Sequence, residues 1–160
     1  MVTKAYLCEV KDLLDHEKVN ELKNYTQHGG TTCFEHSVRV SLYSYKICKL
    51  LKWDYKSAAR GGLLHDFFLY DWHTTSLDGK LHGFEHPKIA LNNAEKEFEV
   101  NNIEKDIILK HMWPLTISKV PKYKESVVVS LMDKYSAIGE MTQRFISNKA
   151  KVKKNHRGAV

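Results

Sequence analysis

The chain has 160 residues, of which 42% are hydrophobic and 28% charged, and its formal net charge is +6. A chain of this length and composition is expected to form one domain with its own core, which excludes a wholly disordered protein. No stretch is long and apolar enough to predict a membrane span, and the first residues lack the apolar centre of a secretion signal. We therefore expect a cytoplasmic protein without membrane contact.

The three cysteines favour the same compartment. Cys8, Cys33 and Cys48 are odd in number and have no CxxC spacing, which is typical of reduced thiols rather than of a disulfide framework.

Apolar residues recur at helical spacing along most of the chain, which predicts an all-α fold: a single compact bundle of about six helices. The predicted helices span residues 11–25, 32–52, 55–68, 87–99, 102–113 and 124–149. The second has the clearest start, because Thr32 and Glu35 have the spacing of a capping box. Residues 69–85 are predicted to form a loop, and Pro87 fits the first turn of the helix that follows.

Two adjacent glycines, Gly61 and Gly62, lie inside the third predicted helix. Glycine in a helix costs about 1 kcal/mol relative to alanine, so the pair predicts close contact with another helix.

The C-terminal segment is strongly basic, with lysine and arginine but no acid between Lys149 and Arg157. We divide the chain into a folded domain of residues 1–148 and a tail of residues 149–160. The simplest interpretation is a frayed, solvated tail. Nucleic-acid binding through phosphate contacts is the alternative, but no aromatic residue in the tail supports base stacking.

Histidine and aspartate recur at wide spacing on five of the predicted segments. The candidates are His36, His65, Asp66, His86, His111 and Asp133. Imidazole nitrogen and carboxylate oxygen form a ligand set for Zn, Fe or Mn. Each residue has a structural alternative: His86 could cap a helix, for example, and Asp133 could pair with Lys134 on the surface. Only the joint pattern is specific for a metal site.

The order H…HD…H…H…D resembles the HD-domain superfamily of metal-dependent phosphohydrolases, over roughly residues 31–140. The matching stretches are Phe34–Val38, Gly62–Asp66, Gly83–Pro87, Ile108–His111 and Leu131–Lys134.

The resemblance implies one or two divalent ions, such as Fe, Mn, Zn or Mg. The implied ligands of the first ion are His36, His65, Asp66 and Asp133; those of the second are His86 and His111, with Asp66 bridging both. The sequence departs from the nucleotide-cleaving pattern after Asp66, where Phe67 and Phe68 replace Ile-Gly, and the Gly-Tyr-Pro motif of cyclic-dinucleotide phosphodiesterases is absent. No specific substrate is therefore implied.

We expect hydrolysis of a phosphoester or phosphoanhydride in a small, phosphorylated, nucleotide-like molecule, because a bound ion lowers the pKa of water from about 15.7 towards 7. Asp66 is the expected catalytic carboxylate. Lys110 and Lys134 are expected to supply positive charge because each adjoins a predicted ligand.

The expected substrate contacts are His28, His82 and Arg60. A di-iron oxygenase acting on a small polar substrate is the alternative, because such HD proteins have the same ligand order. A non-enzymatic binding module that uses the basic tail is a third interpretation, and the oligomeric state is left open.

Overall fold

A computed structural model of the chain describes residues 3–27, 30–76, 79 and 81–157, with backbone alone at residues 148 and 150–157. It is 69% helical, with seven α-helices and no strand among the described residues, so the all-α prediction is confirmed. The elements are α1 (Lys4–Leu14), α2 (Glu17–Glu21), the 3-10 turn η1 (Leu22–Asn24), α3 (Cys33–Leu50), α4 (Tyr55–Leu64), α5 (His82–Glu97), α6 (Asn102–Lys110) and α7 (Lys124–Arg157).

The N-terminal region differs from the single helix expected over residues 11–25. Helix α1 begins seven positions earlier than expected, at Lys4, because the Thr3 side chain accepts a hydrogen bond from the Tyr6 amide and caps the helix. The helix stops at Leu14, and its buried face of Tyr6, Val10 and Leu13 joins the core. The short helix α2 and the turn η1 follow as separate elements.

Other helix boundaries also differ from the predicted ones. The third expected helix ends at Leu64 and not near Phe68, because the backbone leaves the helix before Leu69, whose φ is +55°. Helix α5 begins at His82, so Pro87 lies inside it and the preceding loop is shorter than expected. Helix α6 ends at Lys110 and not near residue 113. Helix α7 continues beyond Lys149 to Arg157, since no glycine or proline occurs between these two residues.

Helices α3 and α4 form the closest pair, as the two glycines predicted. A Cβ atom built on Gly62 would lie 3.0 Å from the Ser41 Cα of α3, and one on Gly61 would lie 2.7 Å from the Ile107 side chain of α6. Helix α4 is therefore pressed between α3 and α6. This close packing brings the first turn of α3 towards the C-terminal end of α4.

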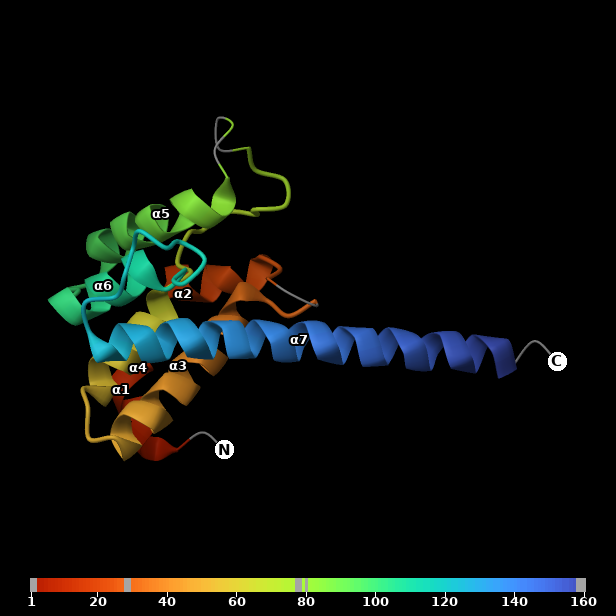
Figure 1. Cartoon of the computed structure of the whole chain (residues 1–160), viewed down its shortest axis with the longest axis horizontal. Coiled ribbons are helices and arrows are strands. Elements are labelled where there is room, and N and C mark those ends of the chain that lie inside the picture. The colour runs from red at the N-terminus through yellow and green to blue at the C-terminus, as the bar shows by residue number, and fades with distance from the viewer. Residues whose placement is uncertain (1–2, 28–29, 77–78, 80, 158–160) are drawn as a thin grey trace.

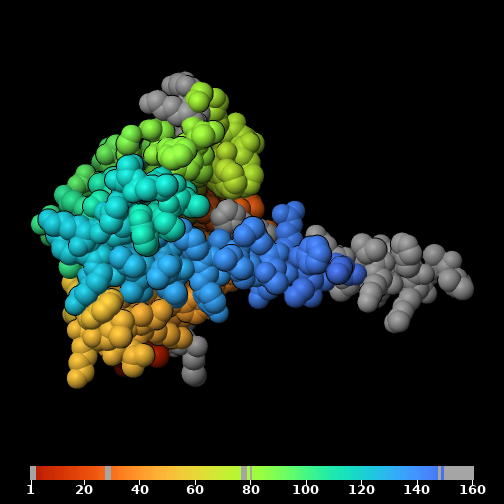
Figure 2. Space-filling model, viewed as in Figure 1, coloured from red at the N-terminus to blue at the C-terminus, as the bar shows by residue number. Residues whose placement is uncertain are grey.

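Helix α7 crosses this bundle and extends well beyond it (Figure 1). Its first half packs against α3, α4 and α6, whereas side chains beyond Glu140 that the structure describes are exposed. The space-filling view shows the same segment leaving the body of the protein (Figure 2). In the described part of the chain, no helix is apolar over a length that could cross a membrane.

Candidate metal centre

Six side chains from five segments meet in the interior of the bundle. His36 lies in the first turns of α3, His65 caps the C-terminus of α4 with Asp66 next to it, and His111 caps the C-terminus of α6. His86 and Asp133 come from within α5 and α7. All six are the residues expected to be ligands.

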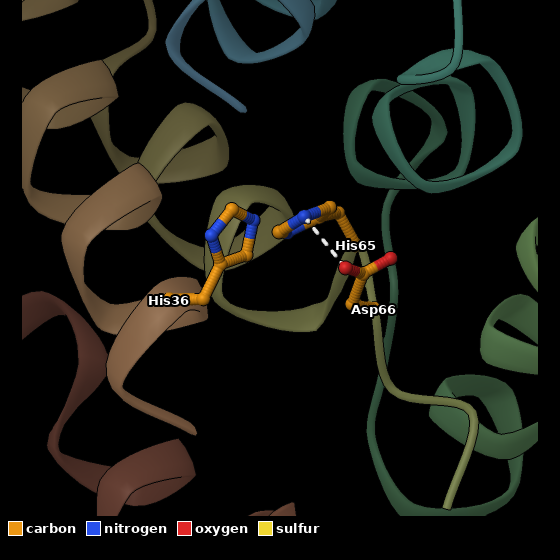
Figure 3. A group of neighbouring side chains, drawn as sticks. All are labelled: His36, His65 and Asp66. Carbon is orange, nitrogen blue, oxygen red and sulfur yellow. Dashed lines mark ion pairs between the residues drawn. The ribbon is translucent and has the colours of Figure 1, made fainter. Parts of the chain in front are cut away.

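The first group of potential ligands lies between α3, α4 and α7. His36 Nε2 is 3.1 Å from Asp133 Oδ1, and His65 Nε2 is 3.3 Å from Asp66 Oδ2 and 3.8 Å from Asp133 Oδ1. Figure 3 shows the rings of His36 and His65 side by side, with the Asp66 carboxylate next to His65. These atoms can surround one ion.

The second group shares Asp66 with the first. Asp66 Oδ1 lies 3.2 Å from His86 Nε2 and 3.5 Å from His111 Nε2, and these two nitrogens are 2.8 Å apart. The Asp66 carboxylate thus directs one oxygen towards each group. This is the arrangement that a carboxylate bridging two ions requires.

Backbone carbonyl groups fix the orientation of three of the histidine rings. The Nδ1 atoms of His65, His86 and His111 donate hydrogen bonds of 2.8–2.9 Å to the carbonyl oxygens of Gly62, His82 and Ile108. Because a carbonyl only accepts, Nδ1 carries the proton, and the lone pair of Nε2 faces the centre. This is the ring orientation that metal-binding histidines adopt.

The geometry fits metal ions better than it fits hydrogen bonding alone. Donors around an ion with bonds of about 2.1 Å lie about 3.0–3.4 Å apart, close to the separations seen here. The Nε2 atoms of His86 and His111 lie 2.8 Å apart and, when both rings are neutral, present two lone pairs to each other; His65 Nε2 is buried without a hydrogen bond among the described residues. A cation at either position satisfies these lone pairs.

The buried carboxylates and imidazoles strongly change one another's ionisation. Burial raises the pKa of Asp66, but His65 and His86 outweigh it and hold that pKa well below its usual range. Burial and the positive charges of His65 and His86 lower the pKa of His111 to about 3. Burial also lowers the pKa of His36, but Asp133 and Glu140 overcome this and raise it to about 10. At neutral pH the centre therefore presents ionised carboxylates, as metal binding requires.

Two residues that the sequence analysis missed form hydrogen bonds with the potential ligands. Both carboxylate oxygens of Glu140 lie 3.1 Å from His36 Nδ1, and Arg39 donates a hydrogen bond of 2.6 Å to Glu140 Oε1. On the other side, the Gln27 amide donates a hydrogen bond of 2.6 Å to Asp66 Oδ2. The spacing of Glu140, seven residues after Asp133 on one helix face, is the signal that could have identified it.

A cavity of about 240 Å³ opens onto the centre. Its walls include four of the expected ligands, and Lys134 and His82 also line it as expected. The full lining consists of Gln27, Asp66, Trp72, His82, Gly83, His86, His111, Met112, Leu115, Asp133, Lys134 and Ala137.

The structure does not bring the other expected contacts to this cavity. Lys110 Nζ pairs with Asp106 Oδ1 at 2.7 Å, one turn back along α6. Arg60 pairs with Asp12 at 2.7 Å and with Glu104 at 3.3 Å, and it lines a separate groove. His28 lies outside the described residues. Carboxylates on neighbouring surfaces hold Lys110 and Arg60 outside this cavity, and the roles expected of the two residues stay predictions.

A helical domain with a buried cluster of histidines and aspartates belongs to the class of candidate metalloproteins. Among protein-family models, that of the HD domain matches residues 33–138, a range that contains all six central residues. The chain therefore belongs to the HD domain family, which is of the metal-dependent hydrolase type. No curated protein and no solved structure matched the chain.

Proposed function

We propose that this protein is a metal-dependent phosphohydrolase that uses two divalent ions to cleave a small phosphoester. The observation that carries the proposal is that two groups of potential ligands share Asp66. One group contains His36 and His65, and the other contains His86 and His111. Two ions at such a centre supply a hydroxide nucleophile at neutral pH and neutralise the phosphoryl oxygens.

The protein's own residues prepare this chemistry. Asp66 stays ionised for the electrostatic reasons given above; burial raises the pKa of Asp133, but His36, His65 and Lys134 outweigh it and keep that pKa below its usual range. Both carboxylates would hold the divalent ions. The Nδ1 hydrogen bonds of His65, His86 and His111 keep the rings from rotating away. Hydrolysis of a phosphoester demands this kind of prearranged charge, since positioning and electrostatic stabilisation provide most of its rate enhancement.

Among the described residues, Lys134 is the lysine or arginine that lines the cavity. Its Nζ atom lies 3.0 Å from Asp133 Oδ2 and also donates to the carbonyl oxygen of His111. These two bonds hold the ammonium group between two ligand-bearing segments, on the cavity wall. We assign Lys134 to the stabilisation of a phosphoryl oxygen.

The rest of the cavity favours a small substrate with a partly apolar leaving group. Met112, Leu115 and Ala137 form apolar wall, and Trp72 and His82 contribute ring surface. The Tyr70 hydroxyl lies 2.9 Å from His82 Nδ1 and orients that ring. A volume of about 240 Å³ is below the range of about 300–1,000 Å³ typical of drug-sized ligands, which supports a small phosphoester.

The test combines metal analysis with a substrate panel. Anaerobically purified protein is analysed for metals, loaded with Mn²⁺, and assayed for phosphate release from para-nitrophenyl phosphate, nucleoside monophosphates and nucleoside triphosphates. We expect two ions per chain and metal-dependent release, preferentially from monophosphates. Asp66→Ala should remove both metal and turnover, whereas Asp15→Ala, at an exposed surface pair, should change neither.

Several outcomes would contradict the proposal. Normal turnover by Asp66→Ala would exclude a role for the shared carboxylate. A folded, metal-loaded protein that releases no phosphate but consumes oxygen with bound iron would establish the di-iron oxygenase instead.

A further inference from the structure

The Gln27 side chain lies between a buried thiol and the central carboxylate. Its Nε2 atom donates a hydrogen bond of 2.6 Å to Asp66 Oδ2, and its Oε1 atom accepts one of 3.2 Å from the Cys33 thiol. Only 9% of Gln27 and none of Cys33 is exposed. The three side chains therefore form a buried chain of hydrogen bonds that ends at the proposed metal centre.

The backbone around Gln27 is held on both sides. Its amide donates to the Thr31 carbonyl at 2.8 Å, and the preceding carbonyl of Thr26 accepts a hydrogen bond of 3.1 Å from the Trp72 ring. Cys33, at the start of α3, donates its own amide to the Tyr25 carbonyl. The chain segment that carries Gln27 is thus tied to the same helix that carries His36.

The two neighbours of Gln27 determine which way its amide points. Burial and the negative charge of Asp66 raise the pKa of the Cys33 thiol, so it keeps its proton and must donate. An ionised carboxylate can only accept. The Gln27 oxygen therefore faces Cys33 and its NH₂ group faces Asp66, because the reverse orientation would place oxygen against oxygen.

We propose that Gln27, oriented by Cys33, is a positioning residue that fixes the Asp66 carboxylate so that each oxygen faces one metal position. The supporting geometry is that the two oxygens of the Asp66 carboxylate contact different histidines. Oδ1 lies 3.2 Å from His86 Nε2, whereas Oδ2, which receives the Gln27 hydrogen bond, lies 3.3 Å from His65 Nε2. Rotation of the carboxylate would break this hydrogen bond.

This inference rests on the proposed two-ion site but concerns a residue outside the family match. The HD domain model begins at residue 33, after Gln27. Gln27 donates a hydrogen bond to the Asp66 carboxylate alongside the contacts from His65, His86 and His111. It therefore adds to the six central residues a support that comes from outside the matched range.

Mn²⁺ binding to the full-length protein tests the inference directly. Free Mn²⁺ is followed by electron paramagnetic resonance during titration of the metal-free protein, and the unfolding free energy of the same sample is measured without metal. Residues that support metal ligands in this way change affinity by about 10–100-fold when replaced. We expect a loss of that size in Gln27→Leu, and no loss in Gln143→Leu, at an exposed position of α7.

Replacement of the thiol separates hydrogen bonding from packing. Cys33→Ser retains an O–H donor for Gln27, whereas Cys33→Ala removes it, so Mn²⁺ affinity should be near wild type in the first and reduced in the second. Cys48→Ala is the matched control, because Cys48 is also fully buried but belongs to a separate apolar cluster that includes Ala58 and Ile107. It should lower stability without changing Mn²⁺ affinity.

The outcomes distinguish this inference from the proposed function. If the wild-type protein binds no Mn²⁺, the metal centre itself fails, and the inference fails with it. If the wild type binds two ions and folded Gln27→Leu binds them equally well, the inference alone is overturned. Should Gln27→Leu not fold, the two Cys33 variants decide: equal affinity in serine and alanine variants overturns the inference, and rescue by serine supports it.

Discussion

His86 Nε2 and His111 Nε2 lie 2.8 Å apart in the interior, each with its lone pair directed at the other. Both rings are fixed in this pose by carbonyl groups of their own helices, since their Nδ1 atoms donate to His82 and Ile108. With both rings neutral the contact is electrostatically unfavourable, and a bound metal cation or a proton on one ring relieves it. The fold thus holds two histidines in an arrangement that becomes stable when an ion binds.

Metal binding should stabilise the fold. An ion that binds only the folded protein, present at 100 times its dissociation constant, adds about 2.7 kcal/mol to the unfolding free energy. We expect urea unfolding of chelator-treated protein to shift to higher midpoint on addition of Mn²⁺, and to shift less in His111→Asn. An unchanged midpoint in the wild type would contradict metal binding at this centre.

The metal-free protein should show a pH dependence that arises from His111. Its pKa falls from the ordinary 6.5 to about 3 in the folded protein, chiefly through burial. Because the unfolded chain binds the proton first, the stability that this residue contributes is complete above about pH 6.5 and is lost as the pH falls towards about 3.

His36 titrates in the opposite sense, because its raised pKa stabilises the fold below about pH 6.5. The contribution of His111 is therefore measured as the difference in unfolding free energy between the wild type and a variant. Unfolding free energies of wild type and His111→Asn are compared at about pH 7.5 and about pH 5. The advantage of wild type over the variant should shrink at the lower pH. A constant difference would show that His111 does not stay neutral in the folded protein.

Gly62→Ala should destabilise the protein by about 1–3 kcal/mol, because a methyl group there would press on the α3 backbone at Ser41 and overpack the contact. Gly139→Ala is the control, since nothing lies within 4 Å of the added carbon on α7. That change should stabilise the helix by up to about 1 kcal/mol. Equal effects of the two variants in urea unfolding would refute the close approach of α3 and α4.

Glu140→Gln should weaken metal binding by about 10–100-fold, because the neutral amide no longer holds His36 Nδ1 as strongly and leaves Arg39 unpaired. The control is Glu95→Gln, which disrupts the exposed pair with Lys105 and should leave affinity unchanged. Affinity is measured by Mn²⁺ titration. A loss confined to Glu95→Gln would contradict the role of Glu140.

Thiol titration should detect one reactive cysteine in the folded protein. Cys8 is exposed, whereas burial raises the pKa of Cys48 to about 12 and also raises that of Cys33. Since the thiolate is the reactive form, Ellman's reagent at neutral pH should modify one thiol per chain, and three after denaturation. Rapid modification of a second thiol without unfolding would show that Cys33 or Cys48 is accessible.

Local chemistry made part of this protein predictable. The Thr32–Glu35 capping box forms as expected, and Asn101 caps α6 with Glu104 as its partner. The two glycines of α4 correctly indicated a tight helix contact. These features depend on residues close in sequence or on a single steric demand, so the pattern along the chain contains the information.

The order of histidines and aspartates also identified the family and the six side chains that meet. It could not tell which neighbouring cations would join them. Lys110 and Lys134 both adjoin such a residue, yet successive side chains on a helix point about 100° apart. Lys110 turns to Asp106, whereas Lys134 reaches the carbonyl group of His111.

The amino-acid sequence by itself determined the helical class and the chemical identity of the centre, because helix periodicity and ligand type are properties of the residues themselves. Only the tertiary structure decided that Gln27 and Glu140 support the centre and that Arg60 serves another surface. Those roles arise where segments distant along the chain pack together, and a hydrogen bond between them depends on distances that no local pattern specifies.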